Sequence, residues 1–177
     1  MEKTTEGLLE IVVVDSSRVI ADEAVEYIGE NEFLFDEAIR FAIEGKYPVN
    51  MRAARVVEQS SRRNKDFAKM RLPLFVEAIK KTENDGVKRG FLKIIDRYVP
   101  GSIDEDLLGL VIDICFAMIL SPSEPIAVKW YSILILDKII KKEPDLIPEF
   151  KLTLEDQIDK NSAAMNRMIR KKLKELK

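Results

Sequence analysis

The sequence predicts an all-α protein in which four to five pairs of helices stack into an α-α superhelix. Three observations lead to this prediction. The region from Ser102 to Lys142 reads as two long apolar helices joined by a short proline-containing turn. An apolar residue followed by a basic one recurs at intervals typical of helical repeats. Only seven glycines and seven prolines in 177 residues favour long regular elements over many tight turns.

The two central helices show why neighbouring helix pairs are required. The first carries LLGLVIDICFAMIL from Leu107, and the second carries IAVKWYSILILDKII from Ile126. Both are apolar on nearly every side, and a helix of that kind must be covered on every side. We therefore expect further helix pairs on both flanks. Trp130, Phe91 and Phe116 are expected to be buried between the stacked pairs.

Local signals place the remaining helices. The stretch Leu8–Val14 resembles a buried strand, but no other run of comparable β character follows, so a short helix is favoured. Further helices are expected at 18–28, 33–44, 51–60, a segment through 74 and 79, 87–98, 146–158 and from 161 onward. The expected start signals are the cluster 15–17, Asn31, Asn50 and a capping box of Ser102 with Glu105. Residues 62–65 are expected to form a basic link between helices.

A repeat organises these helices. The apolar–basic pairs that open every second helix are Met51-Arg52, Val87-Lys88 and Val128-Lys129. From Arg18 through Arg52, Lys88 and Lys129 to Asn166 the steps are 34, 36, 41 and 37 residues. Such a period, holding two helices, is typical of an α-solenoid. We expect the recurring basic residue to pair with acids or carbonyls of neighbouring turns, such as Asp15 for Arg18 and Asp85 for Lys88.

The segments V-K-R-G-F-L-K-I-I from Val87 and V-K-W-Y-S-I-L-I-L from Val128 resemble the second helix of HEAT and armadillo-like repeats. The resemblance covers about residues 17–177 and implies a right-handed superhelix that acts as a binding or scaffolding module. At the Met51 match, Arg55 stands where the family pattern has a core residue. We expect residues 1–177 to form one repeat domain.

The segment Glu124–Lys129 and the run Asn161–Ala164 also resemble a group of small uncharacterised bacterial HEAT-like proteins. Some members of that group carry an adenylosuccinate lyase label. Lyase activity is not expected here, because this chain lacks the signature Ser-Ser-x-Met-Pro-x-Lys loop and the catalytic histidines of those enzymes.

Composition narrows the function further. The chain has no histidine and one cysteine, which excludes the usual zinc sites and the Ser-His or Cys-His nucleophiles. It also lacks a P-loop, a G-x-G-x-x-G segment and an EF-hand loop. Carboxylate chemistry stays formally open, although the 31 acidic residues are scattered. We expect no catalytic residues, no cofactor and no metal, with Cys115 a small buried side chain.

Nothing at the start of the sequence resembles a secretory signal, and the longest apolar runs are too short for a membrane span. A cytoplasmic location is therefore expected.

Charge is distributed unevenly along the sequence. Residues 51–100 hold 13 basic and 6 acidic residues, whereas residues 1–50 hold 4 basic and 12 acidic residues. One interpretation is that these charges only solvate helix faces.

The functional interpretation is a basic band that faces an acidic protein segment. The basic band comprises Arg62, Arg63, Lys65, Lys69, Arg71, Arg89 and Lys93. A net charge of −2 argues against a general nucleic-acid binder, and no membrane partner is expected. The alternative is a HEAT-like DNA-repair glycosylase or nucleic-acid-binding protein, which a continuous basic groove with a central acid would favour. Whether the concave face or the basic band is the binding surface stays open.

Overall fold

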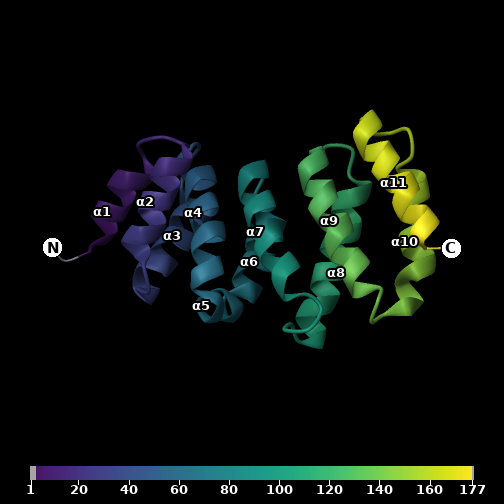
Figure 1. Cartoon of the computed structure of the whole chain (residues 1–177), viewed down its shortest axis with the longest axis horizontal. Helices are drawn as coiled ribbons and strands as arrows, with labels where there is room; N and C mark the ends of the chain where they lie inside the picture. Colours follow the sequence, from purple (N-terminus) through teal and green to yellow (C-terminus); the bar gives the residue numbers. More distant parts are fainter. Residues whose placement is uncertain (1–2, 177) are drawn as a thin grey trace. The chain divides into compact units, whose positions relative to one another are not determined.

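A computed structural model describes residues 3–176, which form α-helices and one short 3₁₀ helix with no strand among them (Figure 1). The helices of the first part are α1 (Thr5–Val12), α2 (Arg18–Ile28), α3 (Glu32–Glu44), α4 (Val49–Arg63), α5 (Lys65–Met70), α6 (Leu72–Lys81) and α7 (Asp85–Tyr98). The others are α8 (Glu105–Leu120), α9 (Ile126–Ile139), the 3₁₀ helix η1 (Pro144–Leu146), α10 (Ile147–Asp156) and α11 (Ala163–Glu175). The all-α prediction is confirmed, and the first apolar stretch is helical as far as Val12, with residues 13 and 14 in a turn. No helix within residues 3–176 has the length and apolar character needed to cross a membrane.

The chain divides into two compact units, residues 1–94 and residues 95–177, and the division falls inside α7. In the first unit α1 packs on α2, α3 on α4, and α2 on α4. Phe75 of α6 and Phe91 of α7 are both fully buried, with ring centroids 4.9 Å apart. The first unit is therefore built from three helix pairs, α1–α2, α3–α4 and α6–α7, with α5 as a short additional turn.

Side-chain caps explain most helix starts. Ser17 accepts a hydrogen bond from the Ile20 amide at 3.3 Å, and Asn31 accepts one from Leu34 at 3.1 Å. These two caps confirm the prediction for α2 and α3. The carboxamide oxygen of Asn84 likewise accepts hydrogen bonds from two amides at the start of α7.

Two predicted start signals are wrong. Asn50 lies inside α4, which begins one residue earlier at Val49 and makes no side-chain cap. The cap of α8 is Asp104, whose carboxylate accepts a hydrogen bond from the Leu107 amide at 2.9 Å, and not Ser102. An ionised carboxylate next to the positive helix start is a stronger acceptor than a hydroxyl two residues farther away. The expected basic link is also wrong, because residues 62 and 63 form the last turn of α4.

In the second unit α9 packs on α8, and α10 packs on α8 and α11. The expectation that α8 is covered on every side is wrong, because Leu110 and Leu120 are 43% and 47% exposed on one face of the helix. Phe91 and Phe116 are buried as predicted, whereas Trp130 is only half-buried. The buried face of α9 runs through Val128, Ser132 and Ile139, and the helical spacing places Trp130 on the opposite side of the helix, which is only partly covered.

Cys115 is the single cysteine of the chain and is fully buried in α8. Burial raises the pKa of its thiol to about 12. Because the thiolate is the reactive form, the folded protein is expected to resist the thiol reagent DTNB at about pH 8. One equivalent should react once guanidinium unfolds the chain. Rapid labelling without denaturant would show that α8 opens readily.

Candidate functional site

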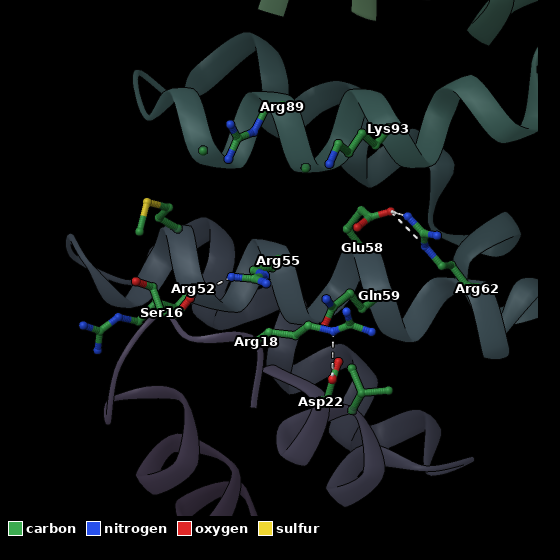
Figure 2. A pocket seen from close by; sticks show the side chains of 14 residues that line it. Ser16, Arg18, Asp22, Arg52, Arg55, Glu58, Gln59, Arg62, Arg89 and Lys93 are labelled. Atoms are coloured by element: carbon green, nitrogen blue, oxygen red, sulfur yellow. Dashed lines mark hydrogen bonds and ion pairs between the residues drawn. The ribbon is translucent and has the colours of Figure 1, made fainter. Parts of the chain in front are cut away.

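Side chains of α2, α4 and α7, with Ser16 before α2, line a cavity of about 810 Å³ in the first unit (Figure 2). We call this cavity the groove. Its lining consists of Ser16, Arg18, Asp22, Val25, Met51, Arg52, Arg55, Glu58, Gln59, Arg62, Gly86, Arg89, Gly90 and Lys93. Six of these residues are cationic and two are anionic. The groove therefore attracts anions, and it is formed by the second helices of three successive pairs.

The sequence of α4 explains how it supplies most of the cations. Its polar face carries Arg52, Arg55, Gln59 and Arg62, which are spaced three, four and three residues apart. This spacing places them on one side of a helix. The opposite face of α4 is apolar, with small buried side chains such as Ala53, and it packs into the core. Burial of that apolar face holds the charged stripe toward the groove.

Two glycines bring α7 close to α4. Gly86 and Gly90 lie one turn apart and both face α4. A Cβ on Gly90 would stand 3.2 Å from the carbonyl oxygen and 3.4 Å from the Cβ of Ala54. A Cβ on Gly86 would overlap the side chain of Met51. The absence of side chains at these two positions lets α7 direct Arg89 and Lys93 into the groove (Figure 2).

Two of the six cations are neutralised by carboxylates of the groove itself. The guanidinium of Arg62 donates twice to one carboxylate oxygen of the buried Glu58, at 2.9 and 3.2 Å. The guanidinium of Arg18 lies 3.4 Å from Asp22. Each pair reduces the net positive charge at its position, and so reduces the attraction for an anion there.

Two other cations are held without neutralisation. Arg52 donates to the carbonyl of Val13 at 2.7 Å, and Arg55 donates to the carbonyl of Ser16 at the same distance. Both carbonyls belong to the α1–α2 loop, residues 13–17. A carbonyl carries no net charge, so each guanidinium keeps its own. The exposed Asp15 has a lowered pKa, mainly because Ser17 donates to it, and the charge of Arg52 adds a small effect.

The basic band predicted from sequence divides between the groove and other surfaces. Arg62, Arg89 and Lys93 line the groove, whereas Arg63, Lys65, Lys69 and Arg71 do not. Arg63 pairs with Glu26 at 3.1 Å, and Lys65 and Lys69 lie on α5. Arg71 binds Asp36 and also Glu32, the latter at 2.6 Å, which raises the pKa of its guanidinium. Arg71 lies between α5 and α6 and is bound to two carboxylates of α3, so it links this part of the chain to α3.

Three arginines of the groove were missed by the sequence analysis: Arg18, Arg52 and Arg55. Arg18 and Arg52 are recurring basic residues of the repeat, so their equivalent positions in successive repeats were the signal that could have placed them on one surface. Arg55 stands where the family pattern has a core residue, and a charged residue at such a position indicates that this side of the helix is exposed. The prediction that the recurring basic residues pair with acids or carbonyls is confirmed for Arg52, which binds a carbonyl, and for Arg18, which pairs with an acid. The expected partner of Arg18 is wrong, because that acid is Asp22 and not Asp15.

Comparison with known proteins supplies one match. A family model described as a HEAT repeat domain matches residues 14–176. Neither a comparison with curated proteins nor one with solved structures gave a match.

Proposed function

The chain belongs to the HEAT repeat family, and we propose that it is a non-catalytic interaction module whose groove binds an acidic segment of a protein partner. HEAT repeats mediate protein interactions in general and hold extended partners on the surface formed by their second helices. The excess of six cations over two anions in the groove carries the proposal. A cytoplasmic location and a single repeat domain over residues 1–177 stay predictions.

A second candidate function is nucleic-acid binding. Cations on three adjacent helices, with the carboxylate of Glu58 among them, are the feature that the sequence analysis associated with this class. One observation weighs against a glycosylase of that class. Glu58 is buried and bound by Arg62, so it is not presented as a catalytic acid.

The test compares a short acidic peptide and a DNA duplex, both fluorescently labelled, by anisotropy at about 150 mM salt. The double variant Arg55→Glu/Arg89→Glu reverses two charges inside the groove. The matched control Lys65→Glu/Lys69→Glu makes the same charge change on α5, outside the groove. We expect the groove variant to weaken peptide binding by at least about tenfold and the control by less than about twofold. Circular dichroism checks that both variants remain folded.

Two outcomes would contradict the proposal. Equal losses in both variants would mean that peptide binding follows overall charge and does not involve the groove. Duplex binding that is tighter than peptide binding, and is lost only in the groove variant, would assign the groove to nucleic acid.

A further inference from the structure

Three arginines of the groove lie where α4 meets α7 and the α1–α2 loop. Gly90 contacts Ala54, so the adjacent residues Arg89 and Arg55 flank the same contact between α7 and α4. Figure 2 shows Arg89 directed from α7 toward α4, with Arg55 on the facing helix. Arg52 lies one turn before Arg55 and is held by the same loop. We call Arg52, Arg55 and Arg89 the arginine cluster.

We infer that the arginine cluster is a subsite for a phosphomonoester and that the acidic partner carries a phosphorylated serine or threonine there. This inference rests on the proposed function, because it names the group that the acidic segment presents to the groove. The cations outside the cluster include Arg18 and Arg62, which already have carboxylate partners. A compact anion of high charge therefore fits the groove better than charges spread evenly along a chain.

The chemistry of the cluster favours phosphate over carboxylate. A phosphomonoester carries a charge of about −1.5 to −2 at neutral pH and offers three strong acceptor oxygens. Arg52 and Arg55 each use one terminal nitrogen on a loop carbonyl, which leaves further donors on a planar group already held in place. Such fixed guanidinium groups bind phosphate oxygens in pairs and lose little conformational entropy on binding.

Two observations favour a peptide as the carrier of the phosphate. The groove extends from the cluster along α4 to Gln59 and Arg62, and its volume of about 810 Å³ leaves space for residues on either side of the phosphate. The side-chain oxygen of Gln59 is buried and has no hydrogen-bond partner among the residues described. A peptide brings N–H donors for such an acceptor, whereas a phosphodiester backbone has none.

The test uses one acidic peptide in two forms, with serine or phosphoserine at its centre, against the wild-type protein and three variants. Arg55→Lys keeps the charge but removes the guanidinium fork, and Arg89→Gln removes a charge from the cluster. Arg63→Gln is the matched control, since Arg63 lies outside the groove and pairs with Glu26. We expect phosphorylation to tighten wild-type binding by at least about tenfold. Arg55→Lys and Arg89→Gln should remove most of this gain, while Arg63→Gln should keep it.

The outcomes separate this inference from the proposed function. Equal binding of both peptide forms, still weakened by Arg55→Glu/Arg89→Glu, would overturn the phosphate subsite and leave the proposed function standing. Peptide binding that no groove variant changes would overturn both. If inorganic phosphate bound as tightly as the phosphopeptide, the inference that a peptide carries the bound phosphate would be overturned. Single-stranded or duplex DNA that binds more tightly, with the same dependence on Arg55 and Arg89, would assign the cluster to phosphodiesters.

Discussion

Replacing Phe91 by alanine is expected to lower the free energy of unfolding by about 3–5 kcal/mol. The ring is fully buried on α7, and its centroid lies 4.9 Å from that of Phe75 on α6. Removal of the ring leaves a cavity between the two helices of one pair and also abolishes the aromatic contact. The measurement is equilibrium denaturation by guanidinium, followed by far-UV circular dichroism.

Trp130→Ala provides the comparison for this prediction. Trp130 is half-buried, so its replacement should cost about 1–2 kcal/mol, less than the loss at a fully buried ring. A loss below about 1 kcal/mol for Phe91→Ala would contradict the packing of α6 on α7. The fluorescence of Trp130, the single tryptophan, reports the second unit, whereas circular dichroism reports the whole chain. Coincident transitions from the two probes would support one repeat domain over residues 1–177.

Gly90→Leu is expected to destabilise the protein by about 1–3 kcal/mol and to weaken binding in the groove. Even a Cβ at this position would lie 3.2 Å from the backbone oxygen of Ala54, and backbone atoms cannot turn aside as a flexible side chain can. A leucine therefore has to push α7 away from α4, which moves Arg89 away from Arg55. Thermal or chemical denaturation measures the first effect, and peptide anisotropy measures the second.

Gly109→Leu is the matched control on α8. A Cβ at Gly109 meets no atom within 4 Å, so the side chain would project into open space. Because leucine is a better helix former than glycine, this variant should gain up to about 0.5–1 kcal/mol. If Gly90→Leu were as stable as Gly109→Leu, the close approach of α7 to α4 would be refuted.

The sequence alone determined the helical class, the repeat and many of the helix boundaries. These features depend on short-range signals. The cap of α2 joins residues 17 and 20, and the apolar stripe of α7 repeats within a few residues. Such interactions are made by residues that are close in sequence whatever the rest of the chain does, so they can be read without coordinates.

Only the tertiary structure decided which charges form a site. Arg71 and Arg55 are both basic residues near helix surfaces, yet Arg71 is bound by carboxylates of α3 and Arg55 by a carbonyl of the α1–α2 loop. Asp36 lies 35 residues before Arg71, and Ser16 lies 39 residues before Arg55. Each separation is about one repeat. Contacts over that distance exist only after helix pairs have stacked. The same stacking decides that Trp130 is half-buried and that one face of α8 is exposed, because burial depends on which neighbours are present and not on the periodicity of the helix itself.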